Sequence, residues 1–151
     1  MFQNSITLKN RHLKFIKTVS ENEKVYGLKS KNGFATSSST QYEDDYGKPI
    51  GMICFWSEKV QAKSCAKDEW KKYNVTEIPL VEFIENWCIG MANDELLIGT
   101  QFDQNLFGYE VEPLDLILEL TTELKLNGKD LNFRKFSGIS DIEKQVKEII
   151  Q

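Results

Sequence analysis

The stretch that decides the expected fold is KVYGLKSKNGFATSSS, residues 24–39. Two runs rich in β-forming residues, 24–30 and 33–39, lie on either side of Lys31 and Asn32. Gly33 can adopt the positive φ that a tight turn needs, because it has no Cβ. The spacing predicts a β-hairpin, so we expect at least part of the sheet to be antiparallel.

Further elements are expected on both sides of this hairpin. Asn10 can cap a first helix, in which apolar residues recur at helical spacing from Phe15 to Val19. After the hairpin, the polar and acidic stretch 41–49 is typical of a loop, and the apolar run 50–57 predicts a third strand.

The second half of the chain is expected to be mainly helical. Ser57 is a suitable N-cap for a helix that continues to Tyr73, and another helix can start between Thr76 and Pro79. The run 95–103 predicts a fourth strand. A turn is expected around Asn105 and Gly108, followed by a helix over 112–124 with Pro113 in its first turn. A last short helix is expected to start at the capping box Ser140-Asp141-Ile142-Glu143.

This element order predicts a single α+β domain over residues 1–151, with a C-terminal helical extension over 124–151. Strands that are adjacent in sequence can pair as hairpins, which favours an antiparallel sheet over a doubly wound parallel one. We therefore expect a small, largely antiparallel sheet of about four strands with helices packed on one face. Trp70 and Trp87 lie on apolar stripes of predicted helices, so both should be mainly buried.

The composition is that of an ordinary globular protein, with 40% hydrophobic and 28% charged residues. Three cysteines without Cys-x-x-Cys spacing indicate buried, reduced thiols rather than a disulfide framework or a zinc site. No apolar run approaches the roughly 20 residues that cross a bilayer, and the first residues lack the pattern of a signal peptide. We therefore expect a cytoplasmic protein that does not interact with membranes.

The catalytic patterns in the sequence are weak. Ser64-Cys65-Ala66-Lys67 has the spacing of a serine activated by a lysine, but Ser64 is expected in the middle of a helix, away from any oxyanion hole. His12, the only histidine, is expected to pack at the edge of the core. We assign no catalytic residue.

Neither a metal ion nor another cofactor is predicted. One histidine and unpaired cysteines argue against a metal site with nitrogen and sulfur ligands. The acidic run Glu43, Asp44 and Asp45 could supply oxygen ligands, but it lacks the glycine and terminal glutamate of a calcium loop and is interpreted as a solvated loop. The glycines form no phosphate-binding fingerprint.

Charge is distributed unevenly along the chain. Residues 1–31 contain seven Lys or Arg and two acidic residues, whereas residues 32–151 contain twelve and twenty-one. Between Tyr73 and Leu124 there are eleven acidic residues and no Lys or Arg. Such a segment repels nucleic acid and could attract a basic protein partner. The alternative is that these carboxylates are merely the solvated faces of two helices.

Several short motifs, spread over about residues 11–120, together resemble the bacterial family called domain of unknown function 2750. The motifs are Gly27-Leu28 with Gly33-Phe34-Ala35, Trp56 with Ala62, Cys65-Ala66 and Trp70, Ile78-Pro79-Leu80 with Phe83 and Trp87, and Gly108-Tyr109-Glu110-Val111 with Pro113-Leu114. The resemblance implies a small α+β bacterial domain without an assigned activity, so no catalytic residue is carried over from the family.

Two functional hypotheses follow. The first is a non-catalytic protein-binding module, in its most specific form an immunity-type inhibitor of a basic toxin. The second is a small enzyme or small-ligand-binding domain with an acidic and aromatic site. The candidate binding residues are Trp56, Glu82, Glu85, Asp103, Glu110 and Glu112.

Overall fold

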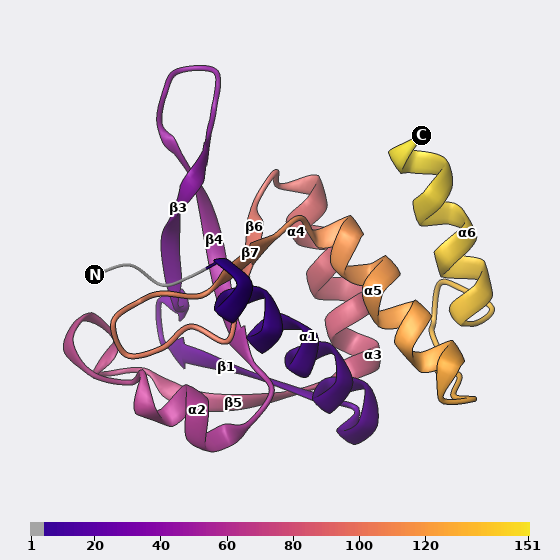
Figure 1. The fold of residues 1–151 in the computed structure, drawn as a ribbon, viewed down its shortest axis with the longest axis horizontal. Coiled ribbons are helices and arrows are strands. Elements are labelled where there is room, and N and C mark those ends of the chain that lie inside the picture. The colour runs from indigo at the N-terminus through magenta and orange to yellow at the C-terminus, as the bar shows by residue number, and fades with distance from the viewer. Residues whose placement is uncertain (1–4) are drawn as a thin grey trace.

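A mixed sheet of seven strands lies at the centre of the structure, a computed structural model that describes residues 5–151 (Figure 1). The strand order is β2-β1-β4-β6-β7, with β3 paired to β4 and β5 paired to β1. The strands are β1 (Lys24–Ser30), β2 (Gly33–Phe34), β3 (Thr36–Glu43), β4 (Pro49–Trp56), β5 (Asn74–Pro79), β6 (Leu97–Thr100) and β7 (Tyr109–Val111).

The predicted hairpin at residues 24–39 is present only at its turn, where Gly33 and Phe34 pair with β1. Ser30 is opposite Gly33 in the antiparallel pairing of β1 and β2, and Gly33 has a φ of 122°. The second half of the expected hairpin then leaves β1, because β3 pairs with β4 instead. Residues 24–39 therefore supply three strands rather than two.

The prediction of a small, largely antiparallel sheet of about four strands is wrong. Two strands were missed: β5, where a helix start was expected, and β7, which lies between the expected turn around Asn105 and Gly108 and the expected helix. The sheet is also mixed, because β4 and β6 are parallel, with Met52 opposite Leu97 and Phe55 opposite Thr100. A parallel pair needs a long crossover connection, and the helices between β4 and β6 lie in that connection.

The helices pack on both faces of the sheet. They are α1 (Ser5–Asn22), α2 (Lys59–Ser64), a 3₁₀ turn η1 (Asp68–Trp70), α3 (Leu80–Glu82), a π-helical section η2 (Phe83–Cys88), α4 (Ile89–Asn93), α5 (Pro113–Leu126) and α6 (Ile139–Ile150). Figure 1 shows α1, α3 and α5 on one side of the sheet, with α2 beside β5.

Several helix boundaries differ from the prediction. The first helix includes Ser5 and so starts before the expected cap at Asn10. The helix expected to reach Tyr73 ends at Ser64, because the chain soon leaves helical geometry: Lys67 is extended and Asp68 has a φ of 53°. The last helix starts at residue 139, one residue before the expected cap.

Two hydrophobic cores lie on opposite faces of the sheet, because successive side chains of a strand alternate between faces. In β4, Phe55 belongs to the larger core with α1, α5 and α6, whereas Cys54 and Trp56 belong to the second core with α2 and η1. Trp70 is buried in this second core, and Trp87 is half-buried beside the larger one. The expectation of helices on one face only is therefore wrong.

Carboxylates hold the segment between α5 and α6 in place. Asp130 Oδ1 accepts hydrogen bonds from the backbone N–H groups of Leu131 and Ile139, at 2.8 and 2.9 Å. Asp141 Oδ2 accepts one from the N–H of Ser137 at 2.9 Å. These bonds favour the charged forms, so the Ile139 and Leu131 N–H groups lower the pKa of Asp130 and the Ser137 N–H lowers the pKa of Asp141.

In the part of the chain from residue 5 onward, no helix is both long enough and apolar enough to cross a bilayer.

Candidate acidic binding groove

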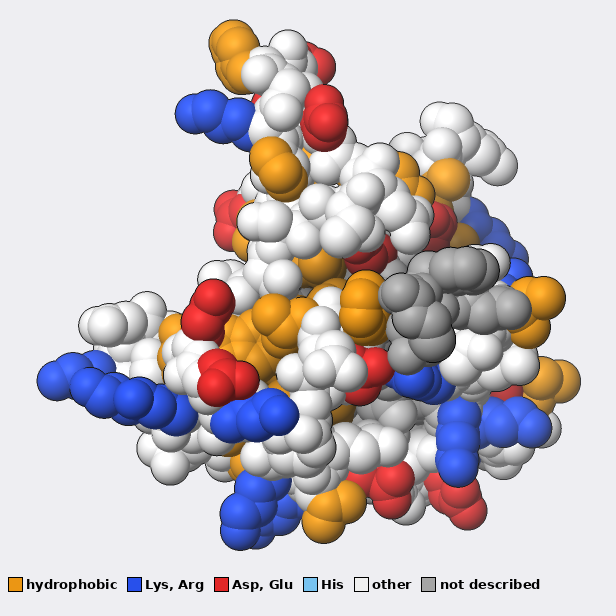
Figure 2. Space-filling view, turned by 60° about the vertical axis from the view of Figure 1, so that its left-hand side comes forward, with side chains coloured by type: hydrophobic (Ala, Val, Ile, Leu, Met, Phe, Trp, Pro, Cys, Tyr) orange, Lys and Arg blue, Asp and Glu red, His pale blue; other side chains and the backbone are white. Residues whose placement is uncertain are grey.

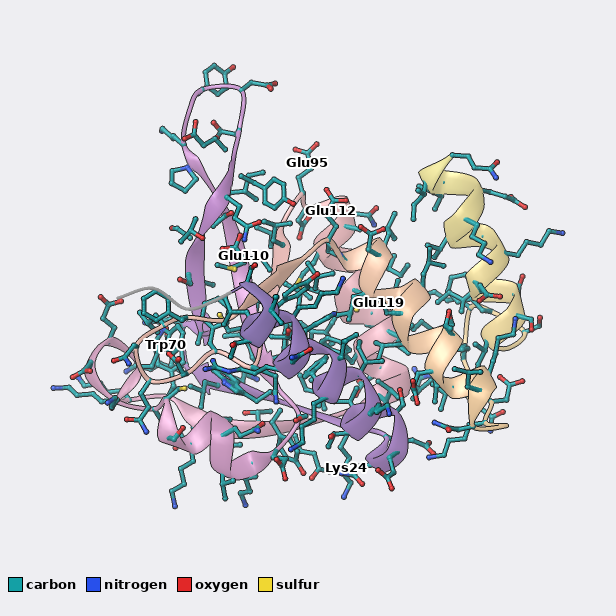
Figure 3. The ribbon with its side chains drawn as sticks, viewed as in Figure 1. Lys24, Trp70, Glu95, Glu110, Glu112 and Glu119 are labelled. Carbon is teal, nitrogen blue, oxygen red and sulfur yellow. The ribbon has the colours of Figure 1, made fainter. Side chains whose placement is uncertain are left out.

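A groove of about 510 Å³, here called the acidic groove, lies where the β3–β4 hairpin meets the starts of β6 and α5 and the end of α6. Six carboxylates line it: Glu43, Asp44, Asp45, Glu95, Glu112 and Asp115. Figure 3 shows Glu95 and Glu112 near each other, between the hairpin and the start of α5. Among residues 5–151, no Lys or Arg lines it.

The hairpin turn places three of these acids at the groove. The Oδ1 atom of Asp44 accepts hydrogen bonds from the backbone N–H groups of Tyr46 and Lys48, at 2.8 and 3.0 Å. Gly47 has a φ of 77°, a backbone conformation that residues other than glycine rarely adopt. These interactions fix a tight turn that stands clear of the body of the molecule (Figure 2).

Between the carboxylates, the groove has an apolar floor. The floor consists of Ile50, Ala92, Leu96, Leu97, Pro113, Leu114 and Ile150. Ile150, at the end of α6, remains 48% exposed, so part of this apolar surface contacts solvent. A surface that combines exposed carboxylates with apolar side chains suits a segment that is both basic and amphipathic.

The six carboxylates of the groove have no close ion-pair partner in the part of the chain that the structure describes. None of them takes part in an ion pair within 4 Å among residues 5–151. Nor do any three of the described His, Cys, Asp or Glu residues group closely enough to hold a metal ion. The groove is therefore a broad negative surface with its charges spread along the rim.

Trp56, one of the predicted binding residues, is part of the core. Its side chain is 0% exposed, its ring makes an edge contact with Trp70, and its Nε1–H donates to the carbonyl oxygen of Phe102 at 2.9 Å. The hydrogen bond satisfies the buried indole, which explains why a tryptophan can occupy this position.

Glu82 and Glu85 lie on the same helical segment but have different environments. Glu82 is exposed at a small cleft near Arg134. Glu85 is 4% exposed and accepts hydrogen bonds from the backbone N–H groups of Arg134 and Lys135, at 3.0 and 2.6 Å. Glu85 therefore joins η2 to the C-terminal segment and is not available to a partner.

Asp103 and Glu110 are also engaged within the chain. Asp103 lies 3.3 Å from Arg11 Nη1 and accepts backbone hydrogen bonds within its own loop. Glu110, on β7, accepts hydrogen bonds from the Ser39 hydroxyl at 2.5 Å and from the backbone and hydroxyl of Thr40, at 3.0 and 2.9 Å. Glu110 thus fastens the base of the β3–β4 hairpin to the sheet.

Of the six predicted binding residues, Glu112 alone lines the acidic groove. Glu82 and Glu85 share the small cleft near Arg134, and Asp103 lines a different one. Sequence reasoning missed Glu95, Asp115 and the run 43–45 as groove residues. The run 43–45 gave a signal, since three consecutive acids are visible in the sequence, but they were interpreted as a solvated loop.

Two other polar arrangements resemble catalytic ones. His12 lies between the Thr100 hydroxyl and a Glu119 carboxylate, at 2.8 Å from each. Both His12 and Thr100 are 0% exposed, so a substrate cannot reach the hydroxyl. Ser64 lies at the end of α2, not in its middle, and its hydroxyl donates to the carbonyl of Gln61 at 2.7 Å.

Comparison with known proteins supplies a family. The family described as Protein of unknown function (DUF2750) matches residues 12–120. Neither the curated proteins nor the solved structures contain a match to the chain. The matched residues include most of the acidic groove and make up more than half of the 151 residues. The chain therefore belongs to the family Protein of unknown function (DUF2750).

Proposed function

We propose that this chain is a non-catalytic protein-binding module, and that the acidic groove holds a basic, amphipathic segment of its partner. The observation that carries the proposal is the combination of an apolar floor with six carboxylates that have no ion-pair partner within 4 Å among residues 5–151. Lys or Arg side chains of the partner would meet the rim, and its apolar side chains would cover the floor.

Electrostatics would act mainly on the rate of association. Exposed carboxylates of one sign create a negative field that attracts a basic partner before contact, and salt screens this field over about 8–10 Å at physiological ionic strength. The apolar floor would then slow dissociation, because its burial does not depend on salt.

In its most specific form, we propose that the partner is a basic toxin and that the chain is an immunity-type inhibitor in the bacterial cytoplasm. The support for this form is charge complementarity alone. The alternative, an enzyme or ligand-binding domain with an acidic and aromatic site, is less favoured, because Trp56 is buried and Glu110 is hydrogen-bonded to Ser39 and Thr40.

The experiment needs two variants of equal net charge. In each variant, three exposed glutamates are replaced by glutamine. The net charge therefore changes equally in both, and only the position of the removed charges differs. The groove variant carries Glu43→Gln, Glu95→Gln and Glu112→Gln. The control variant carries Glu21→Gln, Glu58→Gln and Glu82→Gln, which lie outside the acidic groove.

The wild-type chain is first used to capture a partner from the cells that produce it, and the purified partner is then tested with both variants. Surface plasmon resonance should give an association rate that falls about tenfold in the groove variant and much less in the control variant. The difference should shrink as salt rises.

Equal association rates for the two variants at every salt concentration would contradict the acidic groove as the binding site. The inhibitor form has its own test, because the purified chain should suppress the toxicity of the captured partner. A partner that binds at the groove but is not toxic would contradict the inhibitor and leave the binding module supported.

A further inference from the structure

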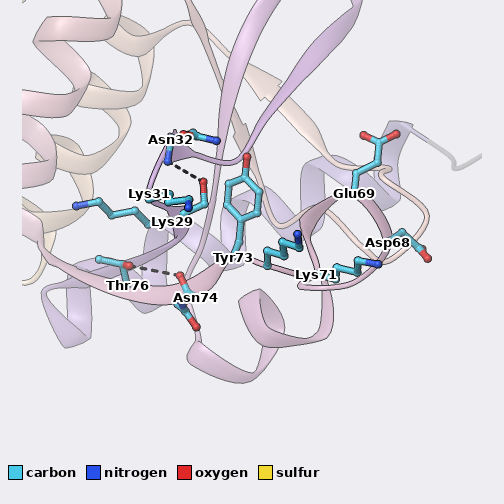
Figure 4. Close-up of a pocket in the computed structure, with 11 residues that line it drawn as sticks. Lys29, Lys31, Asn32, Asp68, Glu69, Lys71, Tyr73, Asn74 and Thr76 are labelled. Carbon is cyan, nitrogen blue, oxygen red and sulfur yellow. Dashed lines mark hydrogen bonds between the residues drawn. The ribbon is translucent and has the colours of Figure 1, made fainter.

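A second cleft, here called the lysine cleft, lies on another part of the molecule and shares no residue with the acidic groove. It has a volume of about 820 Å³ and lies between the β1–β2 turn and the segment that leads from η1 into β5 (Figure 4). Its four cationic residues are Lys29, Lys31, Lys71 and Lys72.

The lysines of this cleft are not paired with carboxylates. Asp68 and Glu69 also line the cleft, yet no ion pair within 4 Å joins them to any of the four lysines. Lys29 Nζ lies 5.8 Å from the centre of the Phe34 ring, which is a weak cation–π contact. The cleft therefore has a local excess of two positive charges in a chain of net charge −4.

Neutral polar groups lie among these charges. The side-chain amides of Asn32 and Asn74 make no hydrogen bond to other residues in the described range 5–151. Tyr73 is half-buried, and Figure 4 shows its ring in the middle of the cleft, with its hydroxyl toward Asn32. The cleft thus has two free amides, an aromatic ring and four lysines among its lining residues, although the Lys29 ammonium is directed toward Phe34.

We propose that the lysine cleft binds a small molecule that carries several phosphate groups. Lysine ammonium groups bind phosphates as point charges, and the three lysines Lys31, Lys71 and Lys72 around one cleft favour a ligand with more than one phosphate. The volume is within the range of small-ligand sites, about 300–1,000 Å³. A planar ring on the ligand could stack on Tyr73 and bond to the amides, so a nucleoside triphosphate fits this chemistry better than a bare phosphate chain.

A small ligand fits better than a nucleic acid polymer. A polymer needs a continuous basic surface along several phosphates, and the whole chain contains 19 Lys or Arg against 23 acidic residues. In addition, Asp68 and Glu69 in the cleft wall would repel a polyanion that extends past the four lysines.

Two variants of equal charge test the lysine cleft by isothermal titration calorimetry. The cleft variant carries Lys31→Gln, Lys71→Gln and Lys72→Gln. The control variant carries Lys9→Gln, Lys59→Gln and Lys144→Gln, all exposed and outside the cleft. The probes are ATP, inorganic tripolyphosphate and a short DNA duplex, each titrated into the full chain at low and at physiological salt.

We expect ATP to bind the wild-type chain, and its affinity to fall at least about tenfold in the cleft variant and little in the control variant. Tripolyphosphate should bind more weakly than ATP, because it cannot use Tyr73 and the amides. Absence of ATP binding at low salt, or equal weakening in both variants, would overturn the proposal. Tighter binding of the duplex than of ATP would also overturn it, in favour of a nucleic-acid surface.

Discussion

The substitution Glu85→Gln should make the protein less stable, although it removes only one charge. The Glu85 carboxylate is 4% exposed and accepts two backbone hydrogen bonds, from Arg134 at 3.0 Å and from Lys135 at 2.6 Å. Glutamine keeps one acceptor oxygen, but its amide NH₂ would face the other backbone N–H. One buried donor would then lose its partner.

The expected loss follows from these contacts. A hydrogen bond to a charged group contributes about 1.5–3 kcal/mol, and a neutral amide is easier to bury than a carboxylate, which offsets part of that loss. We therefore expect Glu85→Gln to lower the free energy of unfolding by about 2 kcal/mol, which corresponds to a Tm lower by about 4–8 °C for a chain of this length.

Glu82→Gln is the matched control, because Glu82 lies on the same helical segment and is exposed. Urea denaturation followed by circular dichroism gives the free energies, and hydrogen exchange of the Arg134 and Lys135 amides reports the local contact. If Glu85→Gln is as stable as Glu82→Gln, and these amides exchange no faster, the assignment of Glu85 to a structural role is refuted.

Three further predictions concern the rest of the chain. The lowered pKa values of Asp130 and Asp141 mean that both carboxylates stabilise the C-terminal segment above their ordinary pKa of about 4, and this stabilisation should be lost as the pH falls through the lowered values. The measurement is the protection of the α6 amides, that is, their hydrogen exchange relative to the intrinsic rate at each pH, which should decrease in acid. Burial raises the pKa of the Cys88 thiol, and the other two cysteines are also buried, so iodoacetamide should label the native chain far more slowly than the urea-unfolded chain. Trp70→Ala should lower the free energy of unfolding by about 3–5 kcal/mol, and Trp87→Ala by less because Trp87 is half-buried, both measured by urea denaturation.

The sequence predicted those elements that depend on residues only a few positions apart. The turn at Gly33 and the proline-led helix α5 are both present, because each depends on the conformational preference of residues within a few positions. β5 was missed because its sequence supports two structures. Val75 and Ile78 favour a strand, whereas Pro79 favours a helix start, and the pairing with distant β1 selects the strand.

The acidic groove could not be predicted for a related reason. Its carboxylates come from the hairpin tip, the start of β6 and the start of α5, and its floor includes Ile150 from the last helix. Eleven acids between Tyr73 and Leu124 indicated a charged surface, but sequence does not show which of them the fold uses internally. The fold uses Glu85 and Glu110 internally, because both accept hydrogen bonds from backbone N–H groups that are distant in the sequence.

The position of β1 in the sheet has a consequence for synthesis on the ribosome. β1 is paired on both edges, and Gly27 is opposite Phe55 on one side and Thr76 on the other. One edge of β1 therefore stays open until residues 74–79 have left the exit tunnel, and an open strand edge can pair with other chains.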